Sequence, residues 1–412
     1  MSAATSQQAD ALLLLICGAF TMVVVPGLAF FYGGMTGRSG VGRAFRAVLA
    51  GSGVVVVLAV MGGYGMIAGR PLIAHVVGTP DMGLASLLSG TGRSADPYPL
   101  ARAGYLIAVC AVAVAVMGTA VASRITLRAW LIFCAVWTVV VLFPACYAVF
   151  ALSDGWAVAG MRVIDFGGAL PVSLAAGSGA AGVILACGRG GQHPLEGRRV
   201  TLVAVGGTLV WIGWFGLTVG SEGAVDGFTM VIALNTLLAS AGGSLMWILV
   251  DRVLLRRPTV TSALCGAVSG LVAITPASGV LTLGWSLLLG ALAALACATM
   301  VDLAARARFG VPMTVCVVHI VASLVGLLFI GLFATGDGMV DSGNFDLFVA
   351  QAIAGLGIAA SSFVVSVIVA LGLRYTVGLT GIRYRANRAL TDAPPARPRQ
   401  RPATRSEESA TG

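Results

Sequence analysis

Residues 314–334 read TVCVVHIVASLVGLLFIGLFA, and this stretch decides the fold class of the chain. It contains no Asp, Glu, Lys or Arg, and a helix of this length crosses roughly 30 Å of hydrocarbon. A strand of a membrane barrel would instead alternate polar and apolar residues over about ten positions. The sequence therefore predicts a membrane-spanning helix here, with His319 as the one histidine within a predicted span.

The rest of the chain repeats this pattern. Of its 412 residues, 58% are hydrophobic and 10% are charged, and the mean hydropathy is +0.97. Soluble domains carry roughly a quarter charged residues. We expect an all-α membrane protein of about eleven transmembrane helices. They are predicted at residues 11–33, 45–68, 103–122, 129–150, 166–187, 200–219, 228–249, 262–281, 284–304, 314–334 and 347–373.

Arginines are distributed unevenly among the polar segments that separate the predicted spans, which we call breaks. Arginines follow the first, third, fifth, seventh and ninth predicted spans, whereas acids follow the sixth and tenth and no charge follows the eighth. Because cationic loops stay in the cytoplasm, the N-terminus is predicted outside and the C-terminus inside an inner or plasma membrane. This bias and the basic tail account for the net charge of +9, so no nucleic-acid partner is expected.

The chain reads as one membrane domain, residues 1–382, followed by a basic cytoplasmic tail, residues 383–412, whose composition predicts disorder. Gly-rich segments recur at 165–182 and 311–326, in corresponding places of two halves. They favour two inverted five-helix repeats plus one extra helix. Such repeats place a solute path at their interface, near the middle of the membrane.

Catalytic and metal-binding patterns are missing from the sequence. The eight cysteines are scattered, with no C-x-x-C pair and no Cys/His cluster, so neither a metal nor a cofactor is expected. His75 and His193 fall in loops, and no H-E-x-x-H or G-x-S-x-G occurs. We therefore expect no enzyme. An aquaporin-like channel is also disfavoured, because no Asn-Pro-Ala occurs.

Eight motifs in a fixed order make the chain resemble the Amt/Mep/Rh ammonium transporter family. They are PGLAFFYGG at 26–34, RAWLIF with a downstream aromatic-Pro at 128–144, DFGG at 165–168, GSGAAG at 177–182, WIGWFGLTVGS at 211–221, LNTLLA at 234–239, SGLVAITPASG at 269–279 and VVHIVASLVG at 317–326. The resemblance covers nearly the whole membrane domain. It implies a homotrimer in which each subunit has its own pore for ammonium or ammonia.

The resemblance also implies how such a pore works. Aromatic rings and a Ser hydroxyl hold ammonium at an outer recruitment site, two Phe rings close the pore below it, and two contacting His line the lumen. A bare cation in hydrocarbon costs several kcal/mol, which explains ring faces at the mouth and passage as ammonia beside hydrogen-bonding imidazoles.

His319 aligns with the second His of that pair, and Ser173 stands where the first is expected. A Ser hydroxyl donates and accepts hydrogen bonds, but it does not titrate near neutral pH as imidazole does. Val311 replaces the acid usual in the second half. The alternative for His319 is a hydrogen-bonded interior residue without a role in conduction.

Three residues align with the recruitment site or its surroundings: Phe150 in place of a Trp, Ser221 as the hydroxyl, and Asp165 in the outer vestibule. Asp165 could cap its helix, stabilise cations, or do both. Ser221 could be a plain helix-end serine. Val109 and Leu217 occupy the two gate positions, so neither gate ring remains.

The tail lacks the acid-Gly-Leu-Asp pattern usual in the family, so regulation by a PII-type protein is not expected.

The leading hypothesis is a transmembrane transporter or channel for ammonium or ammonia with an altered pore pair. The alternative is a non-transporting member that binds or senses ammonium, or a passive pore for another small neutral solute.

Overall fold

The computed structural model describes residues 3–89, 96–188, 199–254 and 257–380. Nearly all of them are helical, and ten of the helices in this part of the chain are long and apolar enough to cross a membrane. Each predicted span overlaps one helical segment. The predicted tail lies outside the described residues.

The first half comprises five helical segments, some of which are interrupted by π-helical turns. They are α1 (Ala3–Met35), α2 (Arg38–Leu58) continued by α3 (Tyr64–Ala68), α5 (Tyr98–Val121), α6 (Leu127–Trp137) continued by α7 (Phe143–Phe150), and the π-helical turn Leu170–Leu174 continued by α8 (Ala175–Cys187). Between α3 and α5 lie a small hairpin, β1 (Pro71–Ile73) with β2 (Val77–Gly78), and α4 (Ala85–Leu88).

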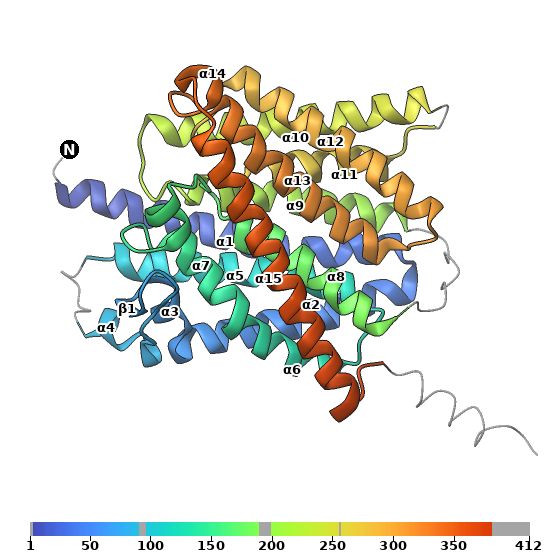
Figure 1. Cartoon of the computed structure of the whole chain (residues 1–412), viewed down its shortest axis with the longest axis horizontal. Helices are drawn as coiled ribbons and strands as arrows, with labels where there is room; N and C mark the ends of the chain where they lie inside the picture. The colour runs from blue at the N-terminus through green and yellow to red at the C-terminus, as the bar shows by residue number, and fades with distance from the viewer. Residues whose placement is uncertain (1–2, 90–95, 189–198, 255–256, 381–412) are drawn as a thin grey trace, which may run out of the picture.

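The second half again has five helices, and the extra helix follows. In the described residues the five are α9 (Val200–Gly220), α10 (Gly227–Val253), α11 (Val260–Ile274), α12 (Leu283–Arg306) and α13 (Val311–Phe333). The short α14 (Met339–Ser342) leads to the extra helix, α15 (Asp346–Thr376). The start of α1 and the end of α15 lie at opposite ends of the bundle (Figure 1). We call these the outer and inner ends, following the predicted orientation.

The predicted end of the eighth span and the predicted start of the fifth span differ from the structure. The two segments are joined there by backbone hydrogen bonds. Helix α11 ends at Ile274 rather than near residue 281, because Pro276 has no amide hydrogen with which to continue it. The backbone N–H groups of Phe166 and Gly167 instead donate to the carbonyls of Pro276 and Thr275, at 3.1 and 2.8 Å. The fifth span accordingly begins its helical turns at Leu170 and not at 166.

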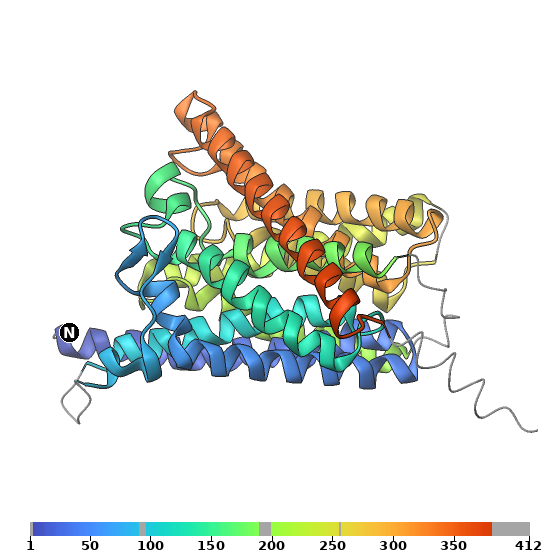
Figure 2. The ribbon, with the colours of Figure 1, turned by 60° about the horizontal axis from the view of Figure 1, so that its bottom comes forward.

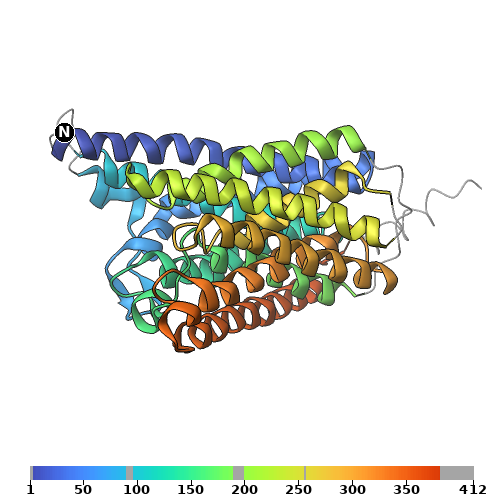
Figure 3. The same ribbon diagram turned by 90° about the horizontal axis from the view of Figure 1, so that it is seen from above.

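Helix α15 crosses the bundle diagonally, over α8 of the first half and α13 of the second (Figures 1 and 2). Seen from above, α1 and α15 lie on opposite edges (Figure 3). Large apolar side chains such as Leu15, Leu245 and Ile368 are about two-thirds exposed, at 65%, 66% and 64%. A surface of this kind suits lipid rather than water.

The halves meet along α1 and α9, which pack antiparallel through glycines spaced seven residues apart. Gly206, Gly213 and Gly220 share one face of α9, and each lies directly against α1. Small residues let two backbones approach closely in a membrane, where no hydrophobic driving force joins helices.

Replacing Gly206 with alanine should therefore destabilise the protein by roughly 1–3 kcal/mol. A Cβ there would meet the amide nitrogen of Phe31 and come within 2.7 Å of the Gly27 carbonyl oxygen. Thermal unfolding in detergent measures the loss. Gly53→Ala is the matched control, because nothing lies within 4 Å of its added Cβ and alanine favours the helix. Equal midpoints for the two variants would contradict the close contact.

Candidate functional site

Ser173 and His319 come from opposite halves and lie in contact at the centre of the bundle. Ser173 belongs to the π-helical turn before α8, and His319 lies on α13. Both side chains are fully buried, and the Ser173 Oγ lies 3.3 Å from the His319 Nδ1. The two aligned pore positions are thus brought together, although they are 146 residues apart in the chain.

The second ring nitrogen of His319 is unpaired among the described residues. Its Nε2 is buried and makes no hydrogen bond within the part of the chain that the structure describes. If Ser173 donates to Nδ1, then Nε2 carries the proton and donates; in the other tautomer Nε2 accepts. Either way, one nitrogen is held and the other is available to a small polar solute.

Two aromatic side chains flank the imidazole. The ring centroids of Tyr32 and Trp214 lie 6.2 and 6.4 Å from that of His319. Trp214 is held in place because its indole N–H donates to the Thr275 Oγ1 at 2.9 Å. These two residues were not predicted as site residues. Tyr32 lies inside the family motif at 26–34 and Trp214 inside the one at 211–221. Their place in these motifs was the sequence signal that could have identified them.

Toward the inner end, Tyr32 lines a cavity of about 10 Å³ together with Thr36, Arg43 and Val311. This volume holds about one water molecule. The Arg43 Nε is buried there without a hydrogen-bond partner among the described residues. A cationic side chain therefore borders this cavity beside Val311, the residue that replaces the acid usual in the family.

Asp165 caps the turn that begins the Ser173 helix. Its buried carboxylate accepts hydrogen bonds from the Ala169 and Leu170 amides, at 2.6 and 2.8 Å. Burial raises the pKa of Asp165 to about 6, against the backbone hydrogen bonds that lower it. The predicted capping role is geometrically present, while the carboxylate still changes charge in the physiological range.

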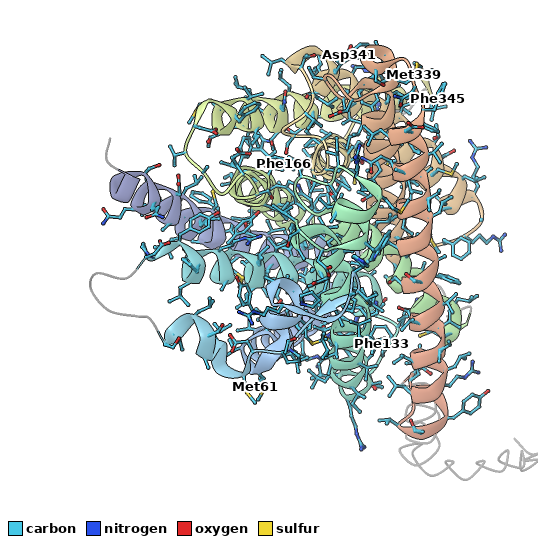
Figure 4. The ribbon with its side chains drawn as sticks, turned by 60° about the vertical axis from the view of Figure 1, so that its left-hand side comes forward. Met61, Phe133, Phe166, Met339, Asp341 and Phe345 are labelled. Atoms are coloured by element: carbon cyan, nitrogen blue, oxygen red, sulfur yellow. The ribbon has the colours of Figure 1, made fainter. Side chains whose placement is uncertain are left out.

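The Asp165 turn packs against the end of α11 and beneath Phe150. The half-buried Phe166 ring lies against Gly279. Phe166 is labelled amid the helices in Figure 4, whereas Met61 projects from the edge of the bundle. Gly168 adopts a φ of +76°, and a Cβ there would lie 2.5 Å from the Phe150 ring. Only glycine fits this position without strain. Phe150 and Asp165, both predicted for the outer vestibule, are thus neighbours.

Ser221 is joined to the same region through Tyr105, which was not predicted as a site residue. The Ser221 Oγ donates to the Leu217 carbonyl at 2.8 Å and lies 2.9 Å from the Tyr105 hydroxyl. Tyr105 also hydrogen-bonds the Leu217 carbonyl. One turn outward on α5, Arg102 donates to the Phe150 carbonyl at 3.1 Å. The region predicted as the outer vestibule therefore contains two hydroxyls that share one carbonyl, and a guanidinium on the same helix as Tyr105.

The predicted gate positions, Val109 on α5 and Leu217 on α9, are both fully buried. Their aliphatic side chains offer dispersion contacts but no ring face to a cation. The Tyr105–Leu217 hydrogen bond ties these two helices together just outside them.

Comparisons with known proteins agree with this arrangement. The model of the Ammonium Transporter Family matches residues 12–386. The chain is 30% identical to the ammonium transporter of Mycobacterium tuberculosis (strain ATCC 25618 / H37Rv), over 408 residues covering 90% of this chain and 85% of the relative.

Solved structures share the fold. The crystal structure of Candida albicans Mep2 matches with a TM-score of 0.80 at 25% identity, covering 90% of this chain and 86% of Mep2. A protein described as Sensor Amt Protein matches with a TM-score of 0.82 at 19% identity, covering 95% and 99%. The second likeness concerns the fold alone.

Proposed function

Because this chain belongs to the ammonium transporter family, we propose that it conducts ammonia across the membrane between Ser173 and His319. The observation that carries the proposal is the unpartnered Nε2 of a buried imidazole at the junction of the two halves. A polar solute in a dry lumen needs such a hydrogen-bonding group. The relatives' substrate is ammonium, which supplies ammonia when it loses a proton.

The charges along the path support passage in the neutral form. Arg102 lies at the outer vestibule and Arg43 at the inner cavity, and a fixed arginine opposes cations in a pore. Ser173 cannot relay a proton by charging, and Val311 supplies no acid. We propose that ammonium is held in the outer vestibule, at the hydroxyls and near the Asp165 carboxylate, and releases its proton to the outer water before passage.

The test uses proteoliposomes that contain the full chain and a pH-sensitive dye in the lumen. An ammonium pulse should alkalinise the lumen without electrogenic current, and methylammonium uptake should exceed that of empty vesicles. If a folded protein gives neither alkalinisation nor uptake, conduction is refuted. Binding of methylammonium without flux would instead support a binding or sensing member. A current that follows the ammonium pulse would refute passage as neutral ammonia but not conduction itself.

Asp165 should make recruitment pH-dependent. Its raised pKa means a neutral carboxylic acid below about pH 6 and a carboxylate above it. The negative charge attracts a cation in the vestibule, so the apparent affinity for ammonium should rise roughly three- to tenfold as pH increases from 5 to 7. Asp165→Asn retains a capping oxygen and should lose this rise. A rise unchanged in the variant would exclude Asp165 as its cause.

We also propose a homotrimer with one path per subunit in the plasma membrane. The support is the family membership and the apolar outer surface of the bundle. The mass of the complex purified in mild detergent tests the oligomeric state.

A further inference from the structure

A cavity of about 670 Å³ opens on the α15 side of the bundle, near the inner end and away from the pore pair. Residues of α8, α13 and α15 line it, and these three helices pack against one another. Its apolar lining includes Ile184 and Leu185 of α8, Met313 of α13 and Phe363 of α15. Ligand cavities in proteins are of about this size, roughly 300–1,000 Å³.

Two arginines also line this cavity. Arg124 follows α5, and Arg308 lies between α12 and α13. Neither forms an ion pair with an acid in the described ranges, whereas the neighbouring Arg306 is paired with Asp302 at 2.7 Å. Both belong to the arginine-bearing breaks that are predicted to face the cytoplasm. The cavity thus combines an apolar wall at membrane depth with a cationic rim at the inner surface.

The backbone at Arg308 is strained. Its φ of +63° lies in the left-handed region, where a helix-ending residue is normally glycine. Strain of this kind persists where the surrounding structure holds it in place, and it is concentrated at functional sites. The presence of a long cation at a position of this kind favours a role for its guanidinium.

Backbone groups beside the cavity also favour an anion. Helix α13 begins next to it at Val311, and no side chain caps this helix start. Pro312 has no N–H group and the Met313 amide donates to the Gly310 carbonyl at 2.9 Å, so the helix start contributes its positive dipole end rather than a set of free amides. At the end of α8, where carbonyls would repel an anion, Arg374 donates to the Ala186 carbonyl at 3.2 Å.

We propose that this cavity binds one anionic phospholipid of the inner leaflet, with its phosphate between Arg124 and Arg308 and an acyl chain along the apolar wall. Basic pockets between transmembrane helices on the cytoplasmic side take such headgroups. The chain's own tail does not suit the site, because residues 383–412 carry more arginines than acids. The bound lipid would lie between the inner ends of the Ser173 and His319 helices.

The test titrates the delipidated full-length protein with dioleoyl phosphatidylglycerol, dioleoyl phosphatidylcholine and inorganic phosphate, and counts bound lipid by native mass spectrometry. The first phosphatidylglycerol should bind at least tenfold more tightly than phosphatidylcholine. Arg124→Gln and Arg308→Gly should each weaken it about fivefold, the effect of one cation near an anionic headgroup.

Arg308→Gly removes the charge while relieving the positive φ, so loss of folding does not explain a loss of binding. Arg306→Gln is the matched control: it removes one neighbouring charge outside the cavity and should leave binding unchanged. The proposal is overturned if the two lipids bind equally, if Arg306→Gln weakens binding as much, or if inorganic phosphate competes fully. Because binding is read without transport, its failure is distinct from a failure of the proposed conduction.

Discussion

Replacing His319 with leucine should reduce ammonia flux roughly 10- to 100-fold. The substitution keeps the apolar volume but removes both ring nitrogens, so ammonia would cross the buried section without a partner. An unmade hydrogen bond of this kind costs about 1–3 kcal/mol, and each 1.36 kcal/mol is tenfold in rate. Lumenal alkalinisation in proteoliposomes measures the flux.

His319→Gln provides the matched comparison, because its amide still donates and accepts. It should retain more flux than the leucine variant at the same unfolding midpoint. An equal loss in both variants would mean that hydrogen bonding by residue 319 is not what carries the solute.

Replacing Ser173 with histidine should produce an electrogenic current on an ammonium pulse, where the native protein gives background. Two adjacent imidazoles can pass a proton by charging in turn, which a Ser hydroxyl beside one imidazole does not do. The Ser173 Oγ already lies 3.3 Å from His319, so a ring there would meet its partner.

Ser173→Ala should remain without current, which separates the effect of the imidazole from that of a changed side chain. The thermal midpoint of each variant checks folding, since the position is fully buried and a larger ring crowds it. A folded Ser173→His protein that gives only background current would count against the placement of the pore pair.

Much of the fold could be predicted because each span is a long apolar run with arginines at one end. The contact between Ser173 and His319 was expected only from the resemblance to a family. Their role in conduction stays a prediction. Helical spacing alone does not show which face of a uniformly apolar helix points inward, so Tyr32, Trp214 and Tyr105 were overlooked.

Long-range backbone contacts account for the remaining differences. Pro276 is a local signal for the end of α11. The turn at Phe166 and Gly167 then pairs with Thr275 and Pro276, more than a hundred residues later. The cavity near Arg308 likewise depends on how α8, α13 and α15 come together. Neither the pairing nor the cavity leaves a local pattern in the sequence.

Helix α15 links the segment that contains Ser173 to α13 of the second half. Its Gln351 and Arg374 donate to the Ile164 and Ala186 carbonyls at opposite ends of the Ser173 segment, and its other contacts reach α13. Because these hydrogen bonds fix α15 to the first half, a rocking motion between the halves would have to break the packing of α15 against α13 in every cycle. We therefore expect conduction through a rigid passage in which only side chains move. The flux should then depend on temperature as weakly as permeation through a fixed channel does.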